Sequence, residues 1–474
     1  MLLTMGIFGA ILTANAALGN AATGNATFRA YTAALNAASA HKNKTIPAFA
    51  RKYGLRCSAC HTAWPELNAF GQAFRDNGYQ LGNERDSPIF QNPSYWPATV
   101  RITPQVHEES TTNQVVDATP GDSSIKVERR LTTHGADLSG MDFWTAGTLY
   151  KNISFVVLFS SDNLASFHFE AAWLRFDNLA NSPWLNVKVG KFELDNLISE
   201  KRFLFLSNNG GLYQSYHFAP LGDNNGFGIG DNQLGVELAG HNVGSYTRYS
   251  ASILSSSDGN PGLVTGNSYD GYFTFSQAFQ VPSLGVQRIG AYYYLGQMPT
   301  VYRTSGGAPI AGSGVDNKSF YRVGLAGDLF AGPIEVMPFY MHGRDDPYLG
   351  TSTPGNQVLP TGARGPQWNA EFVETHEYLN SRFVLTQRAE FVRMALQAIP
   401  GTPTNVGDID AYSLGGRWMP FMFSRAGLAL HAEYSLVRTV GNVPLSGDGV
   451  GLPPLTPTTN VWSSSLLFAF DFAF

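Results

Sequence analysis

Two thiols and an imidazole lie within five consecutive residues of this chain, Cys57-Ser58-Ala59-Cys60-His61. This spacing is the attachment signature of a c-type haem. The thiols of Cys57 and Cys60 add to the two vinyl groups of the haem, and His61 then coordinates the iron as the proximal axial ligand. The chain has only these two cysteines among its 474 residues. The motif therefore predicts one covalently attached haem c and, with it, electron transfer.

The same two cysteines also fit a redox-active thiol pair, half of a zinc site or a single disulfide. A zinc site needs further thiol or imidazole ligands at metal-ligand spacing, and a redox-active CxxC pair is typical of a strand–helix unit. Neither context surrounds residues 57–61, so the pattern favours the haem interpretation.

The motif leaves the sixth ligand of the iron open. His107 is the first candidate, because it falls on an expected strand at a position that can face inward. His41, a barrel residue such as Met141, and a five-coordinate iron are the alternatives. Thioether ligation raises the potential of a haem, but apart from Met1 and Met5 no methionine precedes Met141.

Basic residues flank the motif. Arg51 is a candidate contact for a haem propionate, because a guanidinium binds a carboxylate through two parallel hydrogen bonds. Arg51, Lys52 and Arg56 can equally rest on the membrane surface or dock a partner.

The first 96 residues divide into an expected leader and an expected haem segment. The apolar run from Leu2 to Leu12 and the small residues that follow it resemble a secretory signal. Ala38-Ser39-Ala40 offers a second cleavage site, so residues 1–40 are interpreted as signal peptide and leader. Residues 41–96 form the monohaem cytochrome c segment, with Leu67, Phe70 and Phe74 on one face of a helix. A unit this short is rarely stable alone, so we expect it in or against the mouth of a larger domain.

Composition points to a closed sheet for the rest of the chain. Charged residues make up 14% of the sequence, against about 25% in average proteins. Aromatic residues make up 13%, and there are 50 glycines. Aromatic girdles and glycine-rich loops are typical of outer-membrane barrels. The net charge of −5 provides no basic footprint for a nucleic acid, and no later stretch offers the roughly 20 apolar residues of a spanning helix.

From residue 97 to the end, short segments of alternating polarity are separated by clusters of turn residues, which is the pattern of strands with one apolar face. In the last segment Phe468, Phe470 and Phe472 share one face, while Ser465 and Asp471 share the other. A soluble sandwich is the alternative, but so many consecutive strands favour one closed ring. The candidate strands are residues 98–109, 129–138, 151–161, 166–177, 184–194, 211–219, 232–240, 245–256, 269–279, 286–298, 318–330, 333–344, 367–379, 382–394, 409–420, 426–438 and 461–474.

The predicted fold is all-β, a transmembrane antiparallel β-barrel of about 16 strands over residues 97–474 with a small N-terminal α-helical monohaem cytochrome c plug. Intervals 110–128, 257–268, 299–317, 345–366 and 440–460 are expected as external loops, and 331–333 and 379–381 as periplasmic turns. Arg388, Glu390, His431 and Glu433 are expected to face the interior.

The residues around the motif also carry a family resemblance. Phe49-Ala50-Arg51, Gly54, the motif itself, Pro65, Leu67, Gly71, Phe74 and Gly78-Tyr79 together resemble the haem segment of the fused outer-membrane cytochrome–porins, of which the best known are iron oxidases of Fe(II)-oxidising bacteria. The resemblance implies one haem in an N-terminal plug within a barrel of about 16 strands. Lys52-Tyr53 stands where Gln-Thr is expected in the iron-oxidising members, a departure that bears on the substrate more than on the fold.

The function implied by this resemblance is electron transfer in the outer membrane of a Gram-negative bacterium. Extracellular Fe(II) is the expected donor and a periplasmic cytochrome c the expected acceptor, which would make the chain an Fe(II):cytochrome c oxidoreductase in contact with outer-membrane lipid. Two alternatives stay open: a transport porin with a haem sensor or gating domain, and an outlet that passes electrons to external acceptors. The sequence names no Fe(II) site and no catalytic residue.

Overall fold

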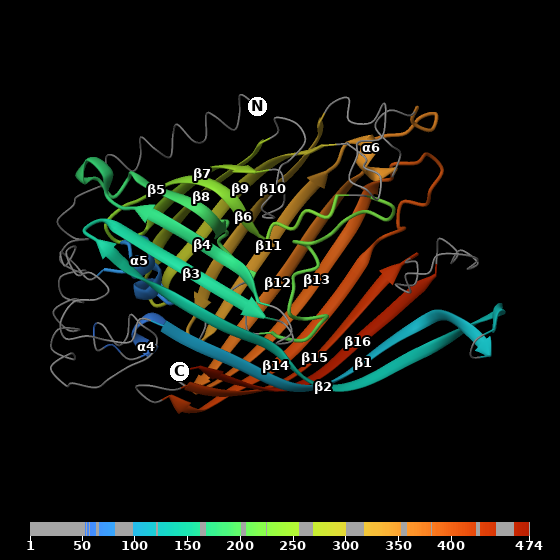
Figure 1. The fold of residues 1–474 in the computed structure, drawn as a ribbon, viewed down its shortest axis with the longest axis horizontal. Helices are drawn as coiled ribbons and strands as arrows, with labels where there is room; N and C mark the ends of the chain where they lie inside the picture. Colours follow the sequence, from blue (N-terminus) through green and yellow to red (C-terminus); the bar gives the residue numbers. More distant parts are fainter. Residues whose placement is uncertain are drawn as a thin grey trace.

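The described residues form a closed antiparallel barrel of sixteen strands, in which the first strand pairs with both the second and the last (Figure 1). This computed structural model describes residues 53, 55, 57–62, 66–80, 98–119, 122–161, 167–200, 205–223, 225–255, 269–299, 317–351, 358–380, 382–422, 427–441 and 459–473. The strands are β1 (Ala98–Thr119), β2 (Asp122–Tyr150), β3 (Ile153–Ser161), β4 (His168–Phe176), β5 (Asn186–Glu193), β6 (Asn232–His241), β7 (Thr247–Ser255), β8 (Tyr269–Val281), β9 (Gly285–Pro299), β10 (Asn317–Ala331), β11 (Ile334–Arg344), β12 (Gln367–Asn380), β13 (Phe383–Leu396), β14 (Ile409–Met422), β15 (Gly427–Val440) and β16 (Asn460–Ala473).

The strands alternate between an apolar outer face and a polar inner face. On β16, Phe468 and Phe470 are 50% and 54% exposed, whereas the intervening Ala469 and the following Asp471 are buried. Because successive side chains of a strand point to opposite faces, every second residue turns outward. An outward apolar band on a closed barrel is the arrangement that outer-membrane proteins present to lipid, so the predicted barrel and its membrane-facing side are confirmed.

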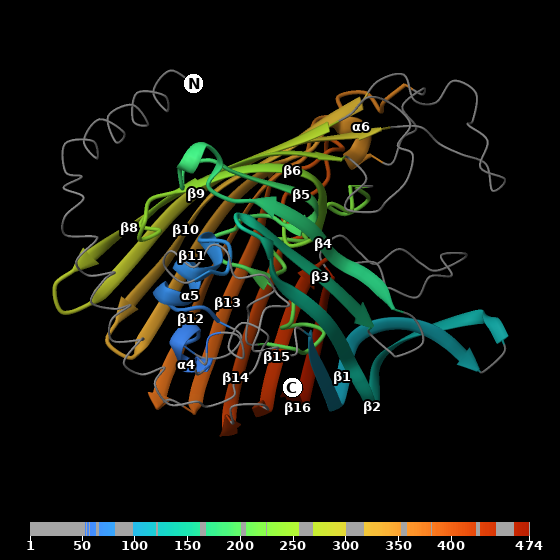
Figure 2. The same cartoon turned by 60° about the vertical axis from the view of Figure 1, so that its left-hand side comes forward.

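Every predicted strand except 211–219 overlaps an observed strand. The interval 110–128, expected as a loop, is also wrong. There β1 and β2 continue as a long hairpin, paired as far as Thr119 and Asp122, that projects beyond the neighbouring strands (Figure 2). The predicted turn at 331–333 is confirmed between β10 and β11, with Gly332 at a φ of 65°.

The two ends of the barrel differ in the length of their connections. At the end where β16 finishes, short turns such as 242–246, 282–284 and 332–333 join the strands. The opposite end carries long connections, including 256–268, 300–316 and 345–366, the last of which contains the short helix α6 (Pro347–Gly350). In bacterial barrels short turns face the periplasm and long loops face outward.

The connection between β5 and β6 runs inside the barrel, and we call its described residues (194–200, 205–223 and 225–231) the luminal segment. Tyr213 stacks on Phe372 of β12 with ring centroids 4.5 Å apart, and Tyr216 packs edge-on against Phe339 of β11 at 5.1 Å. These contacts belong to an apolar core between the segment and the inner wall. Residues 211–219 are therefore not a wall strand. The amides of Gln214 and Ser215 donate to Glu390 of β13, whereas those of Tyr216 and His217 donate to the carbonyl of Tyr213.

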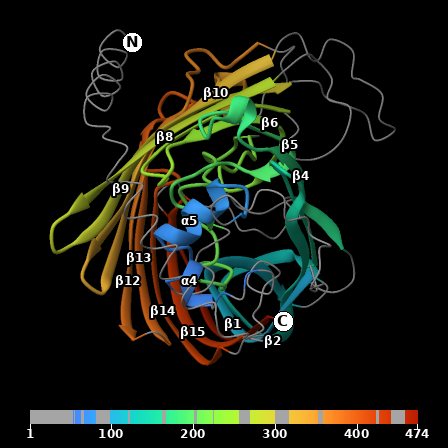
Figure 3. The ribbon, with the colours of Figure 1, turned by 90° about the vertical axis from the view of Figure 1, so that its left-hand side faces the viewer.

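The described N-terminal residues 57–62 and 66–80, here the N-terminal segment, contain α4 (Cys57–Cys60) and α5 (Ala69–Asp76). Figure 3 shows both helices surrounded by the ring of strands. Phe70 and Phe74 are buried on α5 as predicted, but Leu67 precedes the helix and forms a β-bridge with His61. A single 3₁₀ turn, η1 (Leu179–Asn181), lies between β4 and β5. Among the described residues, no helix is long and apolar enough to cross a membrane.

Candidate functional site

The motif helix α4 is packed directly against α5. The side-chain oxygen of Asn68 caps α5 by accepting a hydrogen bond from the Gly71 amide at 2.9 Å. The side-chain nitrogen of the same residue donates to the carbonyl of Ala59 at 3.1 Å. A Cβ at Gly71 would lie 2.1 Å from the carbonyl oxygen of Cys60. Position 71 therefore needs glycine for this close approach, and the pairing of the two helices fixes the backbone of the motif.

His61 is oriented by the chain that follows it. Its Nδ1 donates to the carbonyl of Glu66 at 3.1 Å, and the same carbonyl accepts from the amide of Thr62 at 3.2 Å. A carbonyl can only accept, so the ring proton lies on Nδ1 and Nε2 carries the lone pair in the neutral imidazole. Metal-binding histidines are commonly held in this way, with one ring nitrogen donating to a backbone carbonyl.

Cys60 and His61 line a cavity of about 540 Å³ between the N-terminal segment and the barrel wall. Pockets for small molecules and cofactors measure about 300–1,000 Å³. Apolar wall residues such as Leu158 and Trp173 and cationic ones such as Lys188 complete the lining. The side chain of Cys57 lies outside the described part of the structure, as do Arg51 and the whole of residues 1–40.

Buried ion pairs attach α5 to the wall. Arg248 of β7 contacts the carboxylate of Asp76 at 2.7 Å and that of Asp195 at 2.7 Å, and Arg75 reaches Asp195 at 3.1 Å. Burial disfavours the ionised form of Asp76, but Arg248 and Arg75 outweigh it and hold the pKa of this carboxyl well below its usual range. The pKa of Asp195 is lowered by the same two guanidiniums against the same effect of burial. Both carboxylates are therefore charged.

A second contact lies at the end of α5. Arg175 of β4 donates to the carbonyl of Arg75 at 2.7 Å and pairs with Asp177 at 2.6 Å. Gly78 adopts a φ of 73° beside Asp177, where a Cβ would lie 2.6 Å from the carboxylate. Tyr79 then stacks on Trp173 with ring centroids 6.3 Å apart. Backbone, charge and ring contacts together fix the orientation of the N-terminal segment in the lumen.

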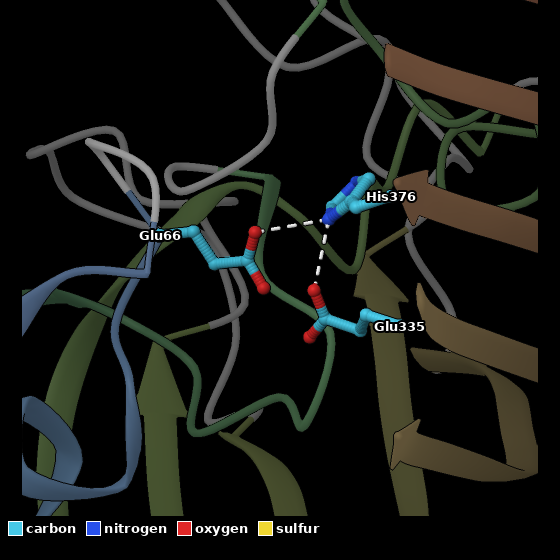
Figure 4. A group of neighbouring side chains, drawn as sticks. All are labelled: Glu66, Glu335 and His376. Atoms are coloured by element: carbon cyan, nitrogen blue, oxygen red, sulfur yellow. Dashed lines mark hydrogen bonds and ion pairs between the residues drawn. The ribbon is translucent and has the colours of Figure 1, made fainter. Parts of the chain in front are cut away.

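The third contact is a group of acidic side chains around His376 of β12, shown in Figure 4. Its Nδ1 lies 2.9 Å from Glu66 Oε2 and 3.0 Å from Glu335 Oε2, and its Nε2 lies 2.7 Å from Glu374 Oε1. One ligand atom each from Glu66, Glu335 and His376 lies within 4.8 Å of the others. Carboxylate oxygen and imidazole nitrogen are the ligands that Fe(II) and Mn(II) bind in proteins. The group suits a divalent cation, and both ring nitrogens of His376 lie within hydrogen-bond distance of its carboxyl groups.

His107, the expected sixth ligand, lies elsewhere on the wall. Its Nε2 is 3.3 Å from Asp137 and its Nδ1 is 3.7 Å from Glu109. The β1 residues that line the cavity are Thr99 and Arg101. Six residues of strand beyond Arg101 correspond to about 20 Å. The role of His107 stays a prediction without support from the cavity, and the alternative Met141 is likewise outside its lining.

The cavity is also lined by His241, a residue that no sequence motif indicated. This residue ends β6 and its Nδ1 donates to the carbonyl of Asn242 at 2.8 Å. Among the described residues its buried Nε2 has no hydrogen-bond partner. Leaving a buried polar atom unpaired costs about 1–3 kcal/mol. The alternation of β6 with Glu237 and Ala239 inward was the available signal, but only the fold shows that this face lines the same cavity as Cys60 and His61.

The interior residues expected on β13 and β15 are confirmed, and they support the luminal segment. Glu390 accepts hydrogen bonds from the amides of Gln214 and Ser215 at 2.8 and 2.9 Å, and Glu433 accepts from the amide of Leu206 at 2.6 Å. Arg388 donates to the carbonyl of Gly210 at 2.6 Å. These three side chains therefore have a structural role inside the barrel, and His431 is buried on the same inner face.

Comparison with known proteins identifies barrels of the same general kind. No protein-family model and no curated protein matches the chain. Among solved structures, the anion-selective porin from Comamonas acidovorans is similar with a TM-score of 0.47 and 9% identity, over 80% of this chain and 99% of that one. The outer membrane channel DcaP of Acinetobacter baumannii has a TM-score of 0.47 and 10% identity, over 82% and 100%. OmpTdeltaL8 of Vibrio cholerae has a TM-score of 0.44 and 12% identity, over 80% and 100%.

Proposed function

We propose that this outer-membrane barrel is an electron-transfer protein that holds one covalently attached haem c inside its lumen. Extracellular Fe(II) is the proposed donor and a periplasmic cytochrome c the proposed acceptor. The observation that carries the proposal is the cavity lined by Cys60 and His61, in which Nδ1 of His61 donates to the carbonyl of Glu66.

The residues present fit a c-type haem in three respects. Cys60 and His61 share one cavity, whose volume of about 540 Å³ suits a cofactor. The lone pair of neutral His61 is on Nε2, the nitrogen opposite its backbone hydrogen bond. The lining also brings apolar side chains such as Leu158 and Trp173 to the cavity, whereas its cations Arg101 and Lys188 are paired with Asp471 and Glu237. Cys57 and Cys60 would supply the thioether bonds and His61 an axial ligand.

When bound, the haem would supply a one-electron couple. The chain's own residues give that couple its surroundings. Trp173 and Leu158 contribute apolar side chains to the lining of the cavity. The pairing of Asp76 with Arg248 keeps α5, and through Gly71 the motif helix, in a fixed position. A site held in a fixed position lowers the reorganisation that accompanies a change of charge.

The position of the N-terminal segment supports a periplasmic acceptor. The wall residues that contact it, such as Arg175, Arg248 and His376, all lie near the strand ends joined by short turns. By the usual orientation of bacterial barrels, this end faces the periplasm. A soluble cytochrome can approach there, while a donor from outside must enter through the lumen.

The Glu66 group supports a metal ion as the donor. Glu66 lies five positions after His61 in the chain, and its carbonyl accepts the hydrogen bond from the imidazole. Its carboxylate faces Glu335 and His376 in the arrangement that suits Fe(II). An Fe(II) substrate bound there would lie close to the residues that hold the haem.

The test uses the full chain matured with c-type haem and purified in detergent. We expect covalent haem after denaturing electrophoresis, none in Cys57→Ser/Cys60→Ser, and a sharp reduced α band after anaerobic addition of Fe(II). Absence of covalent haem from the wild type would overturn the whole proposal. A haem that dithionite reduces and Fe(II) does not would remove iron as the donor and favour an electron outlet.

A transport porin gated by its N-terminal segment is the second candidate, favoured by the closed sixteen-strand ring itself. Single-channel conductance in planar bilayers separates the two. The luminal segment and the N-terminal segment both occupy the lumen, so electron transfer predicts small conductance that haem reduction leaves unchanged. A large conductance that changes with haem reduction would support the gated porin.

A further inference from the structure

Two imidazoles belong to the described lining of the cavity, those of His61 and His241. His61 belongs to the N-terminal segment and His241 to the wall strand β6. No methionine belongs to that described lining. Proteins bind haem iron through imidazole, thioether, thiolate or tyrosine oxygen. Of the two lining tyrosines, Tyr79 stacks on Trp173 and Tyr249 donates its hydroxyl proton to the carbonyl of Trp184 at 2.6 Å. His241 is therefore the lining group best suited to face His61.

Both imidazole rings make the same kind of hydrogen bond to the backbone. Nδ1 of His61 donates to the carbonyl of Glu66 at 3.1 Å, and Nδ1 of His241 donates to the carbonyl of Asn242 at 2.8 Å. A backbone carbonyl on Nδ1 leaves the lone pair of the neutral ring on Nε2, which is the tautomer and orientation that metal-binding histidines use.

The side chain of His241 is also built into the wall. It is 6% exposed, and its Nε2 is buried with no hydrogen-bond partner among the described residues. Buried polar atoms are nearly always paired, and one without a partner calls for an explanation such as an ion or ligand that completes it. Arg248, opposite His241 in the β6–β7 register, is occupied by Asp76 and Asp195.

We propose that Nε2 of His241 is the second axial ligand of the haem iron, which makes the site bis-histidine, His61 from the plug and His241 from the barrel. This inference rests on the proposed function, because it requires the haem. It replaces His107, which lies outside the cavity lining. His431 also has a buried Nε2 without a described partner, but it lies on β15 outside that lining.

The barrel itself would then supply a ligand to the haem iron and influence its potential. A ligand from β6 ties the iron to the wall, so the N-terminal segment and the barrel form one redox unit instead of a cytochrome resting in a pore. Two imidazole ligands give a low-spin iron with a lower potential than a histidine–methionine pair.

The experiment compares haem-loaded wild type with His241→Ala, His241→Met, His107→Ala and His431→Ala in detergent. Covalent haem is measured by denaturing gel and pyridine haemochrome, folding by the heat-modifiable mobility of the barrel, and ligation by the electron paramagnetic resonance of the ferric protein. We expect low-spin wild type, loss of the low-spin signal in His241→Ala, and its return when free imidazole is added. His241→Met should stay folded and shift the potential upward, while His107→Ala and His431→Ala stay like wild type.

The outcomes separate the two proposals. Wild type without covalent haem overturns the proposed function and this inference with it. Wild type with covalent haem, but with a low-spin signal that survives in folded His241→Ala, overturns the inference alone, as does a wild type that is high-spin. Loss of the low-spin signal in His107→Ala and not in His241→Ala would overturn the inference and identify His107 of β1 as the second ligand.

Discussion

The hydroxyl of Tyr378 lies 2.8 Å from Glu66 Oε2 and 2.6 Å from Glu335 Oε2. One phenolic proton is therefore shared between two carboxylates, one from the loop after the haem motif and one from the barrel wall. Tyr378 and Glu66 are separated by 312 positions of sequence. The contact shows that the wall is built to hold the N-terminal segment at this point, and that the point is rich in negative charge.

Glu66→Gln should weaken a divalent cation at this group. The change keeps the shape of the side chain and removes one carboxylate ligand, so we expect at least about tenfold weaker binding, equivalent to about 1.4 kcal/mol. Titration with Mn(II), followed by the loss of its free electron paramagnetic resonance signal, measures this. Glu108→Gln is the matched control, because Glu108 is 47% exposed and lies on β1. If Glu66→Gln and wild type bind Mn(II) with equal affinity, the group is an ion-pair network and not a cation site.

Asp76→Asn should release α5 from the wall. The substitution leaves Arg248 and Arg75 to share Asp195, and breaking a buried ion pair costs about 3–5 kcal/mol. Hydrogen exchange measured by mass spectrometry should become faster in peptides covering residues 69–80, with the strands of the barrel unchanged. Asp137→Asn provides the control, since that side chain is 52% exposed. Unchanged exchange in Asp76→Asn would mean that the other contacts suffice to hold the segment.

The wall of the barrel was predictable because lipid imposes a rule on each strand separately. Phe468, Phe470 and Asp471 show this: apolar residues every second position and polar residues between them identify the strand without knowledge of its neighbours. The hairpin formed by β1 and β2 over residues 110–128 was not predicted, because it projects past the wall and has no lipid-facing apolar stripe.

The lumen was not predictable in the same way. Residues 211–219 carry aromatic residues like a strand, and what decides their conformation is Glu390, which binds the amide of Gln214 from 176 positions away. The candidate site divides likewise. Cys60 and His61 form a local motif, whereas Glu335, His376 and His241 join it only through closure of the ring, which no local pattern encodes.

The acid pair of Asp223 and Asp345 should make the luminal segment sensitive to pH. Burial and the carboxylate of Asp345 raise the pKa of Asp223 from 3.8 to about 8. The folded protein then keeps a proton that the unfolded chain gives up, so the associated stability is complete below the unfolded pKa and is lost as pH rises to about 8. Infrared spectroscopy should show a protonated carboxyl band that disappears with a midpoint near that pH.

Asp223→Asn serves as the control for that titration. Asparagine keeps a donor toward Asp345 and cannot ionise. The component of the band that titrates near pH 8, and the part of the pH dependence of thermal stability that Asp223 contributes between about 4 and 8, should therefore be absent. A band in wild type that titrates near pH 4 would show that the pair is hydrated and that Asp223 ionises normally.

Gly71→Ala should disrupt the support of the haem motif with little effect on the barrel. The added Cβ would lie 2.1 Å from the carbonyl oxygen of Cys60, and a backbone atom of a packed helix cannot move aside as a side chain can. Overpacking of this kind costs about 1–3 kcal/mol, here concentrated on the contact between α4 and α5. We expect normal heat-modifiable mobility, faster hydrogen exchange in α5 and several-fold less covalent haem per barrel. Gly140→Ala, where a Cβ meets nothing within 4 Å, should leave all three unchanged. If Gly71→Ala keeps the hydrogen exchange and haem content of the wild type, the motif is positioned by the barrel wall and not by α5.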